Sequence, residues 1–224
     1  MIRTEHLKTY LLKQDTDLPM LGTDSLLLSR FCTLHKGAKV LDLGCGVGVL
    51  ALLLAEQQQA LTLDGIERNP ASAALAEKNL RENGLTGTIL CGDLRESGWF
   101  SQGHYDLIVC NPPYFPAGSG PSASRRNAEA RSDGTCTLED ICRAAEPRLK
   151  TGGRLAVVCR TERLTDLLVS MRCHDIEPKR LQLVQTTPGK APKLFLCEGI
   201  RQGRPGLKTA PTLILQGGCV PISG

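Results

Sequence analysis

Several features that would point to other classes of protein are missing from this chain of 224 residues. It has no run of about 18 consecutive apolar residues, which argues against a transmembrane helix. Its first residues, Met1 to His6, are too polar for a secretory signal, so we expect a cytoplasmic protein with no membrane partner. The chain also lacks internal repeats and any change of composition that would mark a linker between domains.

The ten cysteines include no Cys-x-x-Cys pair, and the two closest in sequence are Cys136 and Cys142. This spacing argues against structural zinc, and we expect no bound metal. Four others end apolar, strand-like runs, where a reduced thiol packs as a small hydrophobic group: Cys91, Cys110, Cys159 and Cys197. The formal net charge of +4 is compatible with a polyanionic partner but does not identify one.

Apolar runs alternate with amphipathic stretches, which indicates repeated βα units. Strands are predicted at residues 39–43, 61–67, 88–91, 105–110, 155–158, 180–185 and 194–200, and helices at residues 48–58, 70–83, 138–149 and 163–171. This alternation predicts an α/β fold with a doubly wound, mostly parallel sheet. Residues 115–136 are interpreted as a long loop, either a lid or disordered. The length suits one domain, with residues 1–38 as an N-terminal segment and residues 39–224 as the core.

The segment Asp42-Leu43-Gly44-Cys45-Gly46-Val47-Gly48 joins the first predicted core strand to a helix. Its glycines allow backbone N–H groups to approach a ligand without obstruction by a Cβ atom. A dinucleotide-binding fingerprint would need glycine at position 49, where this chain has Val49, so pyrophosphate binding is disfavoured. The segment instead resembles motif I of the class I methyltransferases, whose ligand is S-adenosylmethionine.

That resemblance implies S-adenosylmethionine as the cofactor and S-adenosylhomocysteine as its product. The backbone around Gly44 and Gly46 would border the amino-acid part of the cofactor, and Asp42 would help to hold its ammonium group, directly or through water. Cys45 and Gly48 belong to the same predicted cofactor loop. The resemblance also implies a Rossmann-like sheet of seven strands in which the last strand is antiparallel.

Two acidic residues follow the next predicted strands. Glu67 is predicted to accept hydrogen bonds from the ribose hydroxyls of the cofactor, and the alternative is that it only caps the helix beginning near Asn69. At the position of Asp93, class I methyltransferases commonly bind the adenine amine of the cofactor, and the alternative is a surface turn. Their neighbours Arg68 and Leu94 are included in the predicted cofactor site.

The segment Asn111-Pro112-Pro113-Tyr114 directly follows the fourth predicted strand. The amide oxygen of Asn111 and the carbonyl oxygen of Pro112, held rigidly by the prolines, can accept both hydrogens of a planar amino group. Pro113 and Tyr114 are predicted to contact the substrate, and base stacking on Tyr114 is worth about 1–3 kcal/mol. Acceptors placed off the plane of an amine localise its lone pair, which stabilises a geometry that develops only in the transition state.

These four residues match motif IV of the amino-methyltransferases that act on adenine, cytosine or glutamine side-chain nitrogen. Residues 22–28, Gly-Thr-Asp-Ser-Leu-Leu-Leu, and the basic stretch at residues 201–208 resemble a bacterial family that methylates N6 of adenine 37 in a valine tRNA. The similarity covers nearly the whole chain. It implies a tRNA substrate and a monomer or weak homodimer. It also implies a position for Gly22 and Thr23 over the cofactor pocket; Thr23 or Asp24 can in addition cap a helix that begins near Ser25.

The chain departs from the family pattern at residues 130–133, which read Ala-Arg-Ser-Asp instead of Ala-Arg-His-Glu. Arg131 is retained and is predicted to contact a phosphate of the substrate. Other cations are predicted to flank the site as an RNA footprint, the alternative being solvated surface charge: Arg125, Arg126, Arg201, Arg204 and Lys208.

Three other functions stay open. One is N5-glutamine methylation of a protein such as a release factor, although residues 1–38 leave little room for the helical substrate domain of such enzymes. Another is N6-adenine methylation of rRNA or DNA, whose enzymes usually have added recognition domains. The third is a non-catalytic nucleotide- or RNA-binding module, which predicts a damaged cofactor loop, whereas Asp42, Glu67 and Asn111 are intact.

Overall fold

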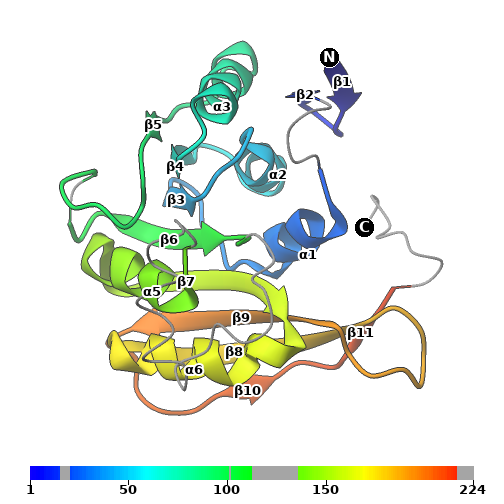
Figure 1. Cartoon of the computed structure of the whole chain (residues 1–224), viewed down its shortest axis with the longest axis vertical. Coiled ribbons are helices and arrows are strands. Elements are labelled where there is room, and N and C mark those ends of the chain that lie inside the picture. The colour runs from blue at the N-terminus through cyan, green and yellow to red at the C-terminus, as the bar shows by residue number, and fades with distance from the viewer. Residues whose placement is uncertain (16–20, 101, 113–135, 216–224) are drawn as a thin grey trace.

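The computed structural model describes residues 1–15, 21–100, 102–112 and 136–215. Its centre is a nine-stranded sheet in the order β10-β8-β9-β7-β6-β3-β4-β5, with β11 also paired to β8 (Figure 1). The strands of this sheet are β3 (Lys39–Leu43), β4 (Thr62–Glu67), β5 (Ile89–Cys91), β6 (Tyr105–Cys110), β7 (Leu149–Arg160), β8 (Ile176–Gln185), β9 (Leu194–Arg201), β10 (Lys208–Thr209) and β11 (Leu213–Ile214).

The pairing of the strands confirms the predicted α/β fold. β3 to β7 are paired in parallel, whereas β9 runs antiparallel to both of its neighbours, β7 and β8. The seven predicted strands are all present, and β9 is the last of them along the chain. Two short strands that the sequence did not indicate, β10 and β11, extend the edge strand β8 in parallel. The strand order reverses between β3 and β6, where open α/β sheets bind ligands at their carboxyl edge.

Helices cover both faces of the sheet (Figure 1). One face is covered by α1 (Thr23–Phe31), α2 (Val49–Gln57) and α3 (Pro70–Glu82), and the other by α5 (Leu138–Ala145) and α6 (Leu164–Cys173). Two short 3-10 turns, η2 (Glu146–Arg148) and η3 (Thr161–Arg163), precede β7 and α6. In β6, Leu107 and Val109 enter the first core, whereas Ile108 and Cys110 enter the second. A strand buried on both faces is mostly apolar, which explains the nearly continuous apolar runs of the sequence. None of the helices in the described ranges is long and apolar enough to cross a membrane.

The start of α3 follows the predicted capping pattern. The Oδ1 atom of Asn69 accepts hydrogen bonds from the backbone N–H groups of Ala71 and Ser72, at 2.9 and 3.2 Å. Pro70 occupies the first turn, where its missing N–H costs no helical hydrogen bond. The chain is thereby fixed directly after β4, next to the carboxyl edge of the sheet.

The segment after α5 differs from the prediction. The helix predicted over residues 138–149 ends at Ala145, and β7 begins at Leu149 rather than at residue 155. Gly153 lies inside this strand, where a Cβ atom would come within 2.9 Å of the carbonyl oxygen of Tyr105. The pair Gly152-Gly153 had suggested a boundary between the predicted helix and the next strand. Instead, it lies within β7 and permits an irregularity in the pairing of β6 with β7.

A separate antiparallel hairpin precedes the core: β1 (Ile2–His6) and β2 (Leu11–Asp15). Two side-chain amides of α3 bind its backbone. Asn79 pairs with the N–H and C=O groups of Lys13 at 3.0 and 2.9 Å, and Asn83 pairs with those of Leu11 at 2.8 and 2.8 Å. Asn79 also donates to the carbonyl oxygen of Val47 at 2.8 Å. The hairpin, which the polar start of the sequence did not indicate, is therefore tied to the glycine loop.

Candidate active site

A cavity of about 490 Å³ lies at the carboxyl edge of the sheet, where β3, β4, β5 and β6 end. Eight of the predicted site residues line it: Gly44, Gly46, Glu67, Arg68, Asp93, Leu94, Asn111 and Pro112. Seven further lining residues were not predicted: Leu43, Ile66, Gly92, Arg95, Cys110, Cys136 and Ile141. Apolar walls with a few convergent polar groups are typical of a small-molecule site.

The other residues predicted for the cofactor and substrate site do not line this cavity or fall outside the described part of the chain. Asp42, Cys45 and Gly48 belong to β3 and the glycine loop. α1 begins at Thr23 with Gly22 as its cap residue and no side-chain cap, so the predicted cap by Thr23 or Asp24 is wrong. The remaining predicted contacts fall outside the described residues: Pro113, Tyr114, Arg125, Arg126 and Arg131.

The glycine loop adopts a backbone that favours glycine. Gly44, Gly46 and Gly48 have φ angles of +78°, +53° and +84°, in the left-handed region. The N–H groups of Gly44 and Cys45 donate to the carbonyl oxygen of Ile66, at 2.9 and 3.1 Å. The loop is therefore anchored to the end of β4, and a side chain at any of the three glycines would strain it.

Asp42 is buried beneath this loop, with 3% of its surface exposed. Neither of its carboxylate oxygens has a hydrogen-bond partner among the described residues. Burial, together with the nearby charge of Glu67, raises the pKa of Asp42 to about 8. A buried carboxylate without a partner is unfavourable, and a cationic group of a ligand would satisfy it.

Glu67 ends β4 and lines the cavity. Its Oε2 atom accepts a hydrogen bond from the N–H of Gly46 at 2.9 Å, and its Oε1 atom accepts one from the N–H of Asn69 at 2.7 Å. Glu67 thus holds the glycine loop against the start of α3. Each carboxylate oxygen can accept a second hydrogen bond, so the residue keeps the capacity to bind ribose hydroxyls.

Asp93 forms a bidentate ion pair that the sequence analysis missed. The Nε atom of Arg95 lies 3.0 and 3.1 Å from the two carboxylate oxygens, and its Nη2 atom lies 2.5 Å from Oδ2. Hydrogen bonding from Arg95 lowers the pKa of Asp93, so this carboxyl is ionised at neutral pH. The spacing Asp-x-Arg shortly after a predicted strand could have indicated this ion pair.

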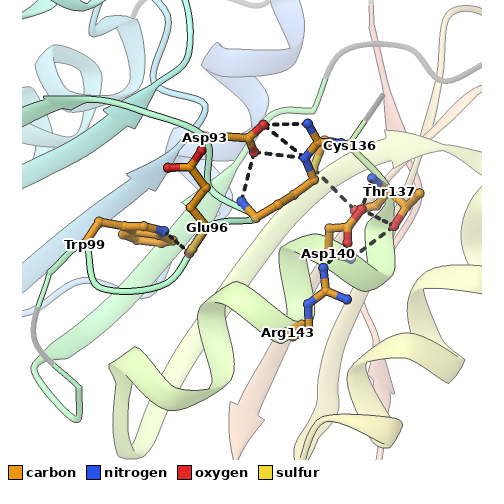
Figure 2. A network of polar contacts seen from close by, with 8 residues as sticks. Asp93, Glu96, Trp99, Cys136, Thr137, Asp140 and Arg143 are labelled. Atoms are coloured by element: carbon orange, nitrogen blue, oxygen red, sulfur yellow. Dashed lines mark hydrogen bonds and ion pairs between the residues drawn. The ribbon is translucent and has the colours of Figure 1, made fainter. Parts of the chain in front are cut away.

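The start of α5 faces the loop that carries this ion pair. Figure 2 shows Asp93 and Glu96 on the loop, opposite Thr137, Asp140 and Arg143 on the helix. The Oγ1 atom of Thr137 accepts a hydrogen bond from the N–H of Asp140 at 3.1 Å, and Asp140 Oδ2 accepts one from the N–H of Thr137 at 2.9 Å. This capping box fixes the wall of the cavity to which Cys136 contributes.

Asn111 is the first residue after β6 and is half-buried. Its Nδ2 atom donates a hydrogen bond to the Oγ atom of Ser25 on α1, at 3.0 Å. Ser25 is itself buried, with 7% of its surface exposed. With the nitrogen end of the amide held by Ser25, the oxygen end is the one available to a ligand. The two residues are 86 positions apart in the sequence, and no local pattern indicated the contact.

The C-terminal cations do not flank this cavity as predicted. Because β9 is antiparallel, its last residue, Arg201, pairs with Ile176 at the start of β8, away from the carboxyl edge of the parallel strands. Arg201 forms an ion pair with Glu146 at 2.7 Å and donates to the carbonyl oxygen of Leu149. The backbone carbonyl of Arg204 accepts a hydrogen bond from Lys179 on β8. The predicted position of Arg201 and Arg204 beside the cavity is therefore wrong, and Lys208 lies on β10, four strands from β6.

The cysteines that the structure describes are all free thiols. Cys110, Cys159 and Cys197 are buried, as predicted, whereas Cys91 is exposed. Burial raises the pKa of Cys45 well above its usual value, so this loop thiol stays protonated. No cluster of three or more His, Cys, Asp or Glu side chains in the described ranges could hold a metal ion.

Comparisons with known proteins agree with this geometry. The sequence model of the methyltransferase small domain matches residues 21–169. A tRNA1(Val) (adenine(37)-N6)-methyltransferase of Porphyromonas gingivalis is 35% identical over 187 residues, covering 79% of this chain and 72% of that protein. An enzyme of the same name from Tolumonas auensis is 33% identical over 195 residues, covering 84% of this chain and 79% of that protein.

Solved structures show the same fold. A predicted O-methyltransferase of Agrobacterium tumefaciens superimposes with a TM-score of 0.71 at 20% identity, covering 87% of this chain and 88% of that one. A putative class I S-adenosylmethionine-dependent methyltransferase of Listeria monocytogenes gives a TM-score of 0.61 at 14% identity, covering 85% and 63%.

The fold and the cavity at its carboxyl edge define a class I methyltransferase that uses S-adenosylmethionine. The chain belongs to the methyltransferase small domain family and to the tRNA1(Val) (adenine(37)-N6)-methyltransferases that its relatives represent. The family resemblance of the sequence is thereby confirmed.

Proposed function

We propose that this protein transfers the methyl group of S-adenosylmethionine to N6 of an adenine in tRNA, with adenine 37 of a valine tRNA as the target. The observation that carries the proposal is the position of Asn111 and Pro112 in the same cavity as Gly44, Glu67 and Asp93. Relatives whose names state this reaction support it. The proposed place of action is the cytoplasm.

The residues present fit the cofactor. The unpartnered carboxylate of Asp42 is suited to an ammonium group, and Glu67 retains acceptor capacity for ribose hydroxyls. Asp93, ionised beside Arg95, is suited to accept a hydrogen bond from an adenine amine. When bound, S-adenosylmethionine supplies a methyl group made electrophilic by the sulfonium charge.

Asn111 and Pro112 would hold the target amine through two acceptors, the Oδ1 atom and the backbone carbonyl. The lone pair of an adenine amine is delocalised into the ring, so acceptors that favour a pyramidal nitrogen make it more nucleophilic. Ser25 contributes by holding the nitrogen end of the Asn111 amide away from the target. Tyr114 is proposed to stack on the base. No strong base is needed, because the methylated ammonium loses its proton readily.

The proposal is tested by incubating the full chain with methyl-labelled S-adenosylmethionine and separate fractions of tRNA, rRNA and total protein. We expect label in the tRNA fraction alone, as N6-methyladenosine, and no label with the Asn111→Ala variant. Label in the protein fraction as N5-methylglutamine would show that the enzyme methylates a glutamine side chain instead of tRNA. Label in the rRNA fraction would show that rRNA is the substrate instead of tRNA.

The position within tRNA is tested with two transcripts of a valine tRNA that differ only in having adenine or guanine at position 37. We expect the adenine transcript to accept one methyl group per molecule and the guanine transcript to accept none. Equal labelling of the two transcripts would place the target elsewhere in the tRNA.

A further inference from the structure

Three cations lie where β7 ends and where β9 begins, in segments for which the sequence predicted no function. Arg160 ends β7, and Lys190 and Lys193 lie in the connection between β8 and β9. All three residues are exposed. We propose that these three residues, here called the basic rim, bind the phosphate backbone of the RNA next to the target adenine. This inference rests on the proposed function and adds the docking surface for its substrate.

Strand register places Arg160, the β7 member of the basic rim, on the strand next to the one that Asn111 follows. Cys110, the residue before Asn111, pairs with Val157 of β7, so Arg160 lies three residues further along the neighbouring strand. Adjacent strands are about 5 Å apart and each residue advances about 3.3 Å, so Arg160 lies roughly 5 Å to the side of the active-site strand and 10 Å beyond its level. Successive phosphates of a nucleic acid chain are spaced on this scale. The nucleotides flanking a base held at Asn111 therefore pass within reach of the basic rim.

Backbone hydrogen bonds join the two segments of the basic rim. Arg160 pairs with Leu194, the first residue of β9. The N–H of Thr161 donates to the carbonyl oxygen of Lys193 at 3.1 Å, and the Oγ1 atom of Thr161 donates to that of Pro192 at 2.9 Å. The end of β7 and the start of β9 are thereby held together, which gives the cations a fixed arrangement at the carboxyl edge.

The lysines of the basic rim differ from most cations of the neighbouring strands in having no acidic partner. Arg154 and Arg180 are paired with Glu198, and Lys150 is paired with Asp106. By contrast, the ammonium groups of Lys190 and Lys193 form no ion pair with any residue in the described ranges. Residues 186–193 also contain no Asp or Glu. A cation without an internal partner is free to neutralise a phosphate and release the counterions of the RNA.

The experiment compares two double variants that remove the same charge from different places. Lys190→Ala/Lys193→Ala removes two exposed cations at the carboxyl edge. The matched control, Arg204→Ala/Lys208→Ala, removes two exposed cations around β10, which lies four strands from β6. Both variants change the net charge by −2, so a general effect of charge on RNA attraction would appear equally in both.

For the rim variant we expect the KM for valine tRNA to rise on the order of 10-fold, with kcat and the Kd for S-adenosylhomocysteine unchanged. The salt dependence of tRNA binding, plotted as log K against log salt, should become shallower by about 0.7–0.9 for each lysine removed. The control variant should keep the KM and the salt dependence of the wild type.

Three results would overturn the inference. A KM of the rim variant within twofold of the wild type would show that the lysines do not meet the RNA, and an equal loss in the control would show only a general charge effect. In both cases methylation of tRNA by the wild type leaves the proposed function standing. A wild-type protein that neither binds nor methylates tRNA would overturn the docking surface and the proposed function together.

Discussion

Two buried carboxylates lie in the same row of the sheet and have opposite surroundings. Strand register places Asp42 beside Val109, Val109 beside Ala156, and Ala156 beside Glu198. Asp42 is 3% exposed and Glu198 is 0% exposed, so desolvation affects both. Neither oxygen of Asp42 has a partner within the described residues. Glu198, in contrast, is surrounded by donors.

The partners of Glu198 come from three elements. Arg154 on β7 lies 2.7 Å from its Oε1 atom and Arg180 on β8 lies 3.3 Å away. Thr33, after α1, donates through its backbone N–H and its hydroxyl, each at 3.0 Å. A carboxylate surrounded in this way contributes to the fold, whereas a carboxylate left without donors at the ligand edge is suited to binding. The following variants are designed to test this difference.

The largest effect is expected at Asn111, whose amide nitrogen is bound by Ser25 and whose amide oxygen has no partner among the described residues. Asn111→Ala should lower kcat by roughly 10²–10³-fold, because it removes an acceptor whose contribution is made mainly in the transition state. The Kd for S-adenosylhomocysteine should stay within about twofold of the wild type. Single-turnover methylation and calorimetry measure the two quantities. A near-normal rate would remove Asn111 from the mechanism.

Glu198→Ala should act on stability and leave the chemistry intact. We expect the free energy of unfolding to fall by about 2–3 kcal/mol, below the roughly 3–5 kcal/mol typical of fully buried pairs, because Arg154 and Arg180 are partly exposed. The control is Glu82→Gln, which breaks an exposed pair with Lys13 and should leave the free energy of unfolding nearly unchanged, because solvent screens that pair. Denaturant unfolding measures both variants. If Glu198→Ala lowered kcat at 25 °C without lowering stability, Glu198 would belong to the site.

Ser25→Ala tests whether the Asn111 amide must be held by α1. We expect kcat to fall about 10-fold, since small errors of position at a reacting group are costly, with the Kd for S-adenosylhomocysteine unchanged. Ser25→Thr keeps the hydroxyl and should restore most of the rate. Added to Asn111→Ala, Ser25→Ala should cause no further loss, because the two residues act as one unit.

The matched control for Ser25 lies one turn further along the same helix. Ser29 is also buried, but within the described part of the chain its hydroxyl bonds only to the backbone carbonyl of Leu26 in α1. Ser29→Ala should therefore keep the wild-type kcat. Equal losses in Ser25→Ala and Ser29→Ala would mean that the helix, and not the contact with Asn111, sets the rate.

The sequence predicted the elements whose cause is local. β3 and β6 have the predicted bounds, because strands buried on both faces are nearly continuous apolar runs. The cap at Asn69 and the glycine loop followed from the backbone preferences of single residues. Eight predicted residues line one cavity, because the ends of parallel strands meet at the same edge of the sheet.

The features that the sequence did not reveal depend on contacts between distant segments. The N-terminal hairpin is held by Asn79 and Asn83, more than sixty residues further along the chain. Arg201 was placed near the site because the direction of β9 relative to the cavity depends on strand pairing, which composition does not show. The lysines of the basic rim were missed for the same reason. Two lysines in a Pro- and Gly-containing connection gave no sign of which edge they occupy.

The central claim is that Asp42 is kept without a partner in order to hold the ammonium group of the cofactor. Its pKa of about 8 means that the unliganded protein carries a protonated Asp42 at pH 7. A bound ammonium group favours the charged carboxylate, so its pKa falls on binding and a proton is released. Affinity should therefore rise with pH, by at most about tenfold per unit, and level off above pH 8.

Calorimetric titration of S-adenosylhomocysteine at pH 7, in two buffers of different ionisation enthalpy, measures this proton directly. We predict release of close to one proton by the wild type and none by Asp42→Asn. Asp93→Asn should still release it, because the lowered pKa of Asp93 keeps that carboxyl ionised throughout. Binding without proton release in the wild type, or equal release by Asp42→Asn, would contradict the role of Asp42. The absence of any heat with this ligand would contradict the whole account.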